Sequence, residues 1–244
     1  MQHKQKALDH FNSYMDGLIS SDDSRMQGKA DKLSYWMDDW TNFLEFEPTF
    51  SPASLRRYKR GEIIKVHLGF NIGSEEGGLH YAVVLDKNNS VNSPVVTVVP
   101  LTSPKPHVDV SKLHKGSVFL GNELFTSLSA KVTALQRISD ADRKRLHAMV
   151  GDFQHVMSAP DSEIDEALER LELLGKKCTL LERMKKEITK MKTGSIALVG
   201  QIRTISKIRI YDPKTNFDVL SNVKLSNEKL DLIDHEIIAL YTGQ

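Results

Sequence analysis

The stretch Arg60–Leu85 reads RGEIIKVHLGFNIGSEEGGLHYAVVL, and it decides how the middle of this chain folds. Around residues 63–68, apolar side chains alternate with polar ones, which is the period of two that is typical of a strand. A second strand-like run follows at residues 80–85, and the loop between them holds three glycines, a serine and two glutamates at residues 73–78. The stretch therefore predicts two strands joined by a glycine-rich loop, with His80 directly at the start of the second strand.

Strand-like segments continue on both sides of this stretch. Val95–Leu101 is rich in valine, and a further β-rich region starts at Gly194. If Leu85 pairs near Val95, the numbers of facing residues sum to about 180, so that His80 faces Pro100. Thr102 then lies two residues further along, on the same face of the sheet as His80.

Helical periodicity dominates the remaining segments. We expect two helices in the first 48 residues, separated by a break at residues 20–24, and a last helix with Ser226 as its N-cap. A helical hairpin is predicted from about Asp140 to Met157 and from Ile164 to Met191. Its second helix carries a nearly heptad seam with Gly175 as the weak point: Ile164, Leu168, Leu171, Leu174, Cys178, Leu181, Met184 or Lys185, Ile188 and Met191.

These patterns predict an α+β fold. Residues 1–58 form an N-terminal helical extension, and residues 59–244 form a β-rich domain interrupted by a helical insertion at about residues 121–193. The extension contains both tryptophans on an apolar stripe, which more often packs on the body of a protein than on a partner.

Composition excludes several classes of protein. The 33 Lys and Arg residues against 32 Asp and Glu residues give a net charge of +1, so a nucleic-acid site must be a local cluster of charge. The single cysteine, Cys178, excludes an internal disulfide, and no apolar run approaches the roughly 20 residues of a membrane span. With a polar N-terminus, these features predict a cytoplasmic protein without membrane contact.

Motifs of other site classes are missing. The loop lacks the G-x-G-x-x-G spacing of a nucleotide site, and no G-x-S-x-G motif is present. His67 falls on the polar side of its strand and is expected to be exposed. His107 and His114 lack the spacing of zinc ligands, so no metal site is predicted.

Four separated segments resemble the PemK/MazF family of toxins, in the correct order. They are Lys59–Ile63, the loop Gly73–Gly78 with the strand Ala82–Leu85, Val98–Ser103, and Gln201–Lys207 with Arg209 beyond. The resemblance covers roughly residues 59–106 and 194–243. It implies a small, curved, SH3-like β-barrel, usually a homodimer, that cuts single-stranded RNA without a metal ion or other cofactor and is silenced by a cognate antitoxin protein.

The chain departs from the family pattern where the family has an arginine followed by proline. Here these positions are His80 and Tyr81, and a charged pair found in some members is replaced by Leu198 and Gly200. An imidazole is suited to act as a general base or acid near neutral pH, whereas arginine mainly stabilises charge. His80 could therefore replace the arginine with a changed role.

The resemblance and this chemistry together give the candidate site. His80 and Thr102 are the predicted catalytic residues, and the predicted substrate-binding residues are Ser74, Glu75, Gly77, Gly78, Gln201 and Arg203. Two functions stay open: a metal-independent endoribonuclease of a toxin-antitoxin system, or a related module that binds RNA, DNA or a protein without cutting. The added helices could also act as a built-in inhibitor.

Overall fold

The computed structural model describes residues 2–150 and 160–243. It divides into two compact units, one formed by Met1–Ser51 with His67–Leu79 and the other by Pro52–Val66 with His80–Gln244. Helices combine with antiparallel strands, which confirms the predicted α+β class. Within the described residues, four short 3-10 helices connect the main elements: η1 (Glu47–Thr49), η2 (Pro52–Ser54), η3 (Val199–Gln201) and η4 (Lys207–Arg209).

The first unit contains the two predicted N-terminal helices, α1 (Gln2–Ile19) and α2 (Ser24–Phe46). The break between them is fixed by Asp23, the N-cap of α2, whose carboxylate accepts a hydrogen bond of 2.9 Å from the Arg25 amide. The helices bury a small apolar cluster: Met15, Leu18 and Ala30, with Phe11 and Leu33 packed against it. The amphipathic pattern of the first 48 residues is thus confirmed only in part, because other apolar residues of the two stripes are exposed: Tyr14, Ile19, Trp40 and Leu44.

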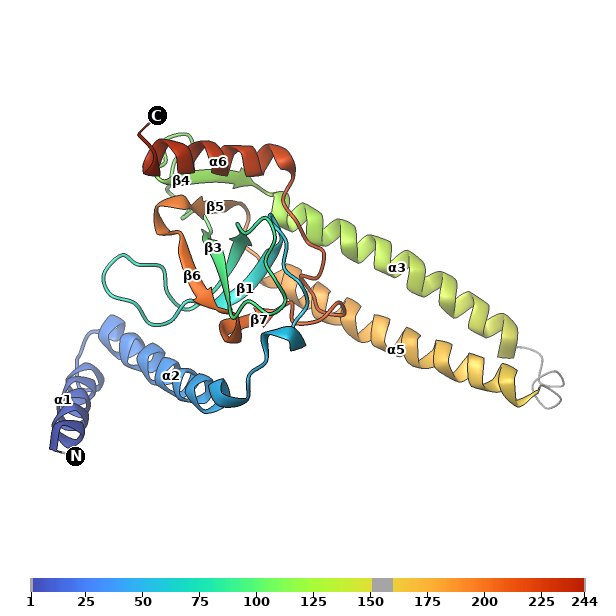
Figure 1. Cartoon of the computed structure of the whole chain (residues 1–244), viewed down its shortest axis with the longest axis horizontal. Coiled ribbons are helices and arrows are strands. Elements are labelled where there is room, and N and C mark those ends of the chain that lie inside the picture. Colours follow the sequence, from blue (N-terminus) through green and yellow to red (C-terminus); the bar gives the residue numbers. More distant parts are fainter. Residues whose placement is uncertain (1, 151–159, 244) are drawn as a thin grey trace. The chain divides into compact units, whose positions relative to one another are not determined.

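The second unit is built on a seven-stranded sheet (Figure 1). Its strands are β1 (Ile63–His67), β2 (Leu79–Val84), β3 (Val95–Thr102), β4 (Ser117–Gly121), β5 (Ser195–Leu198), β6 (Arg203–Ser206) and β7 (Ile210–Asp212). The strand order is β4-β5-β3-β2-β1-β7, and β6 also pairs with β3. Among the described residues no pairing joins β4 to β7, so the sheet is open, whereas a closed barrel was expected.

The inserted helices leave the sheet and return to it at neighbouring positions. Gly121 at the end of β4 pairs with Ser195 at the start of β5, and the intervening chain forms α3 (Glu123–Val150) and α5 (Asp161–Lys190). The two helices run side by side (Figure 1), joined by an ion pair of 2.6 Å between Asp142 and Lys177. In effect, the helical hairpin takes the place of the turn of a β-hairpin.

The expected start of the first of these helices is wrong. The first helix begins at Glu123 and not near Asp140, because Leu124 and Leu128 already pack into the domain core. Its expected end near Met157 lies outside the described residues.

The predicted seam of the second helix is buried only in part. Leu181 and Met184 are buried, whereas Ile164, Leu168 and Leu171 are exposed, as is Cys178. Only the C-terminal half of α5 packs against the core of the domain.

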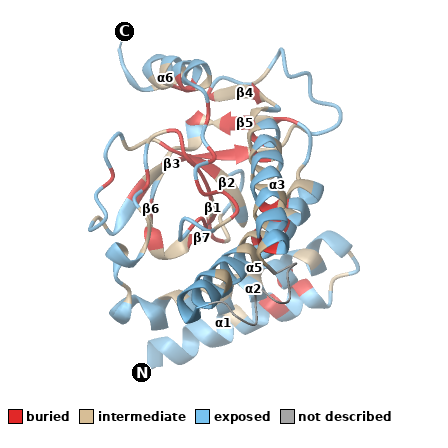
Figure 2. Ribbon diagram, turned by 90° about the vertical axis from the view of Figure 1, so that its right-hand side faces the viewer, coloured by how far each residue is buried: buried red, intermediate tan, exposed pale blue. Residues whose placement is uncertain are grey.

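The core of the second unit lies between the sheet and these helices, and Figure 2 shows its buried positions concentrated in the strands. Strands and helices contribute to it together: Ile63, Val83, Val99, Leu101, Leu120, Leu128, Met184, Val199, Leu220 and Ile233. Burial of each such side chain contributes about 1.5–3 kcal/mol relative to exposure. This shared core holds β2 and β3 rigidly in place.

The last helix, α6 (Asn227–Tyr241), has Ser226 as its N-cap, as predicted. The Ser226 hydroxyl accepts a hydrogen bond of 3.3 Å from the Lys229 amide, and Arg60 pairs with Asp234 on this helix. Within residues 2–150 and 160–243, no helix combines the length and apolar character needed to cross a membrane.

Candidate functional site

His80 and Thr102 lie on the neighbouring strands β2 and β3. Ala82 pairs with Pro100 and Val84 with Val98, so facing residues sum to 182 and the expected pairing of His80 with Pro100 is wrong by two residues. Continued to the start of β2, this register sets His80 opposite Thr102. The expected sum of 180 and the observed sum of 182 are both even, so His80 and Thr102 share one face of the sheet, as the sequence predicted.

The imidazole of His80 is oriented by the backbone of β3. Its Nδ1 lies 3.1 Å from the carbonyl oxygen of Leu101. Because a carbonyl oxygen only accepts hydrogen bonds, Nδ1 carries the proton when this bond forms, and the neutral ring then has its lone pair on Nε2. The half-buried ring of His80 is therefore arranged so that Nε2 can accept a proton.

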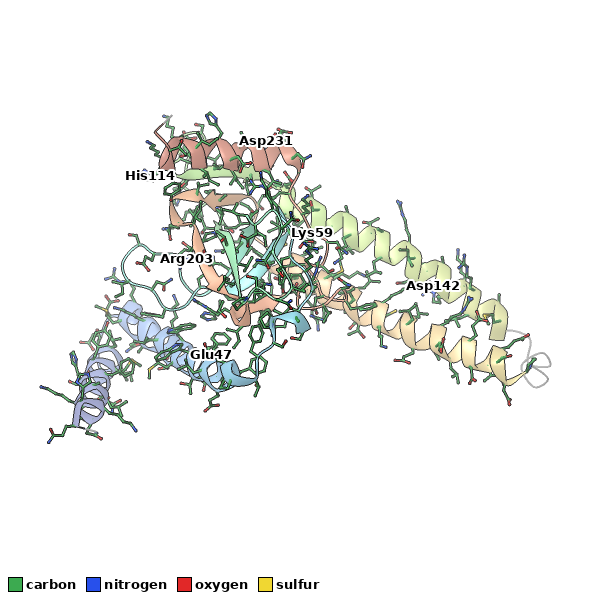
Figure 3. All side chains as sticks on the ribbon, in the orientation of Figure 1. Glu47, Lys59, His114, Asp142, Arg203 and Asp231 are labelled. Carbon is green, nitrogen blue, oxygen red and sulfur yellow. The ribbon has the colours of Figure 1, made fainter. Side chains whose placement is uncertain are left out.

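Gln201 and Arg203 are brought together beside the same strand. Arg203, which is labelled in Figure 3, pairs with Val98 of β3, and its guanidinium donates a hydrogen bond of 3.4 Å to the Gln201 side-chain oxygen. Thr102 pairs with Ile196 of β5 at the other end of β3. The backbone of Arg203 thus lies about 13 Å along the strand from that of Thr102, given about 3.3 Å per residue.

Arg209 adds a second cation near Arg203. Burial lowers the pKa of Arg209, and the positive charge of Arg203 lowers it further. Two guanidinium groups close enough to interact in this way form a local concentration of positive charge, suited to phosphate. Arg209 lies at the end of a segment that resembles the family, but it was not predicted as a site residue.

The glycine-rich loop belongs to the first unit, where it closes on itself. The Leu68 amide donates to the Gly78 carbonyl and the Gly78 amide to the Gly69 carbonyl, each at 2.7 Å. A Cβ at Gly77 would lie 2.7 Å from the Gly69 carbonyl oxygen, which explains why a glycine is needed there. The Gly78 amide is therefore already used within the loop, whereas Ser74 is exposed at its tip.

His67 anchors this loop to α2. Trp36 stacks on its ring at 4.7 Å between centroids, and Asp39 Oδ2 lies 3.3 Å from Nε2. The Gly69 amide donates to Nδ1 at 3.1 Å, so Nε2 carries the hydrogen that faces Asp39. The His67 side chain is only 19% exposed, and its expected exposure is wrong.

A half-buried polar cluster, which the sequence did not predict, ties β2 to the inserted helix. Glu187 of α5 accepts hydrogen bonds from Lys65 and from the hydroxyl of Tyr81, the neighbour of His80. Burial tends to raise the pKa of Glu187, but the hydrogen bonds from Lys65 and Tyr81 outweigh it and the pKa is lowered. Burial, followed by the bond to Glu187, raises the pKa of Tyr81 well above its ordinary value. The insertion thus braces the strand that carries the candidate base.

The predicted site residues divide between the two units. The four loop residues, Ser74, Glu75, Gly77 and Gly78, belong to the first unit, and the other four, His80, Thr102, Gln201 and Arg203, belong to the second. Within the described parts of the chain, no group of three or more His, Cys, Asp and Glu side chains could hold a metal ion.

Comparison with known proteins gives one match. Residues 59–174 match the family described as PemK-like, MazF-like toxin of type II toxin-antitoxin system. No curated protein matches the chain. The match begins at Lys59 and includes the glycine-rich loop, His80 and Thr102, whereas Gln201 and Arg203 lie beyond it. The resemblance that the sequence predicted is confirmed: over residues 59–174, this chain is similar to the PemK-like, MazF-like toxins of type II toxin-antitoxin systems.

Proposed function

We propose that this chain is a toxin-like endoribonuclease that cuts single-stranded RNA, with His80 as the general base. The observation that carries the proposal is the 3.1 Å contact between His80 Nδ1 and the Leu101 carbonyl oxygen. It supports a neutral ring whose Nε2 can take a proton. The family similarity over residues 59–174 supports RNA as the substrate class.

In the proposed reaction, His80 Nε2 removes the proton of an RNA 2′-hydroxyl. The 2′-oxygen attacks the adjacent phosphorus, and the bond from phosphorus to the 5′-oxygen breaks. The 5′-oxygen takes a proton from solvent, which leaves a 2′,3′-cyclic phosphate and a 5′-hydroxyl. Thr102 donates a hydrogen bond to a phosphate oxygen, and Gln201 and Arg203 bind the RNA backbone, with Arg209 adding charge.

Assembly and partners complete the proposal. Ser74, Glu75, Gly77 and Gly78 are proposed RNA contacts on the first unit. By family similarity, the chain acts in the cytoplasm as a homodimer, its curved sheet corresponds to the SH3-like barrel of the family, and a cognate antitoxin protein silences it. The near-zero net charge agrees with RNA binding by local clusters of cations.

The test is cleavage of a mixed-sequence single-stranded RNA by the purified full chain in EDTA, with both product ends mapped. We expect 2′,3′-cyclic phosphate and 5′-hydroxyl ends. The His80→Ala protein, purified in the same way, is the control for contaminating ribonuclease. Binding of RNA by the parent chain without any cleavage would replace the proposal with the non-cutting binding module.

A further inference from the structure

A pocket lies where α5 meets β1 and β7, and none of the candidate site residues lines it. Its volume is about 170 Å³, comparable to a cavity of roughly 150 Å³ that holds a benzene ring. The pocket is lined by Lys65, Arg183, Lys186, Glu187, Lys190, Tyr211, Asp212, Val219 and Leu220. All of these residues belong to the second unit.

The carboxylates of this pocket are engaged by the protein itself. Glu187 accepts from Lys65 and Tyr81, and Asp212 accepts from the amides of Val219 at 3.2 Å and Leu220 at 2.7 Å. With four cations against two carboxylates in its lining, the pocket has an excess of positive charge.

The cations on α5 face the pocket as a row. Arg183, Lys186 and Lys190 follow a spacing of three and four residues, which places them on one side of a helix. Arg183 pairs with Asp218 at 3.2 Å and with Asp212 at 3.7 Å. Among the described residues, neither Lys186 nor Lys190 forms an ion pair, and both are exposed. These two ammonium groups are therefore the charges best able to bind an anion.

An aromatic ring stands beside this row. Tyr211 is the middle residue of β7, and its side chain is exposed because the pleat turns the neighbouring Ile210 and Asp212 inward. An exposed aromatic ring next to cations is the combination that binds single-stranded nucleic acid, since a base stacks on the ring while the phosphate meets the cations. An inorganic anion or an acidic peptide would leave Tyr211 without a role.

We propose that this pocket binds one nucleotide of a single-stranded RNA, with its phosphate on Lys186 and Lys190 and its base stacked on Tyr211. The choice of RNA rests on the proposed function. The family match ends at residue 174, before all three cations of α5, so the match does not cover this subsite. It would lengthen the stretch of RNA that the protein holds.

The test measures binding without cleavage. A fluorescein-labelled 20-nucleotide RNA is titrated in EDTA with full-length His80→Ala protein, at several salt concentrations, by fluorescence anisotropy. Adding Lys186→Ala with Lys190→Ala should weaken binding about tenfold and lower the slope of log affinity against log salt by about 0.7, the value for one lost phosphate contact on a single strand. Tyr211→Ala should weaken binding about tenfold, and Tyr211→Phe should leave it unchanged.

The matched control is Lys185→Ala with Lys192→Ala, which removes the same charge from exposed residues outside the pocket. Equal weakening by both double variants, unchanged binding by the pocket variant, or no binding by the His80→Ala parent would each overturn the subsite. If the unmodified chain cleaves RNA but the pocket variants bind RNA normally, the proposed endoribonuclease activity holds and the subsite is excluded. If binding depends on the pocket but the unmodified chain does not cleave RNA, the subsite holds and the activity is excluded.

Discussion

His80 Nδ1 lies 3.1 Å from the carbonyl oxygen of Leu101, so the backbone of β3 orients the candidate base on β2. The contact depends on the register between the two strands. That register is supported at the other end of the pair, where Asp86 accepts a hydrogen bond of 3.0 Å from the Thr97 amide and the Leu85 amide donates to the Thr97 carbonyl at 2.9 Å. A change in the 86–94 loop that shifts this register would therefore alter the contact between His80 and Leu101.

Replacement of His80 should separate orientation from proton transfer. His80→Ala is expected to lower single-turnover RNA cleavage in EDTA by about two to four orders of magnitude, the usual contribution of general acid–base catalysis. His80→Asn should lose as much, because its amide can still donate to Leu101 but cannot take a proton. Thr102→Val should lose less. Unchanged cleavage by either His80 variant would contradict the assignment.

Stability should depend on pH through Glu187. Its pKa is lowered in the folded chain, so its contribution is fully present above the unfolded value of 4.5 and is lost as the pH falls through the folded value. The difference in thermal midpoint between the parent and Glu187→Gln should thus be largest near pH 6–7 and shrink from pH 5 to pH 3. Glu172→Gln, at an exposed pair with Lys176, is the control and should change little. A difference that stays constant with pH would exclude this linkage.

Two leucines of α5 should respond differently to charge. Leu181→Glu places a carboxylate in the buried part of the helix and should destabilise by about 3 kcal/mol or more. Leu171 belongs to the same predicted seam, but its side chain is 57% exposed. Leu171→Glu should therefore change the free energy of unfolding by about 0.5 kcal/mol or less. Urea unfolding of both variants measures this contrast, and equal losses would show that the seam is buried throughout.

Two glycines should respond to alanine with opposite signs. Gly175 lies inside α5 with nothing within 4 Å of an added Cβ, so Gly175→Ala should stabilise by about 1 kcal/mol. Gly77→Ala brings a Cβ to 2.7 Å from the Gly69 carbonyl oxygen and should loosen the loop. Thermal unfolding tests the first change, and amide hydrogen exchange at residues 68–78 tests the second. Destabilisation by Gly175→Ala would mean that the helix is not regular there.

The strands could be predicted because their valine-rich runs are bounded by turn residues, but their register could not. Hydrogen bonds tie the 86–94 loop to the start of β3, where the side-chain amide of Asn89 donates to the Val95 carbonyl at 2.9 Å. Val95 and Val96 consequently pair with β6, and the β2 pairing moves by two residues.

The first half of α3 was missed for a chemical reason. It is rich in Ser and Thr, which are weak helix formers. Here the hydroxyl of Thr126 donates to the Asn122 carbonyl at 3.0 Å and that of Thr133 to the Ser129 carbonyl at 3.1 Å, so both bond back within the helix. The prediction of this helix rested on the helical spacing of apolar residues further on, such as Leu146 and Met149.

The candidate site was predictable to the extent that it lies on strands. The shared face of His80 and Thr102 follows from the period of two, whereas the contacts of His67 with Trp36 and of Tyr81 with Glu187 join residues far apart in the chain. A pattern of polar and apolar residues carries no information on such partners. Local periodicity predicts which face a residue occupies, and tertiary packing decides what it meets there.

The bond between Glu187 and Tyr81 bears on how such an insertion can arise or disappear. A shortened descendant in which Gly121 turned directly into Ser195 would keep its strand pairing. It would, however, leave the Tyr81 hydroxyl and the Lys65 ammonium without their acceptor, and the core without Met184. Loss of the helices therefore requires compensating substitutions at these positions, so relatives without the insertion are expected to differ at positions 65 and 81 together.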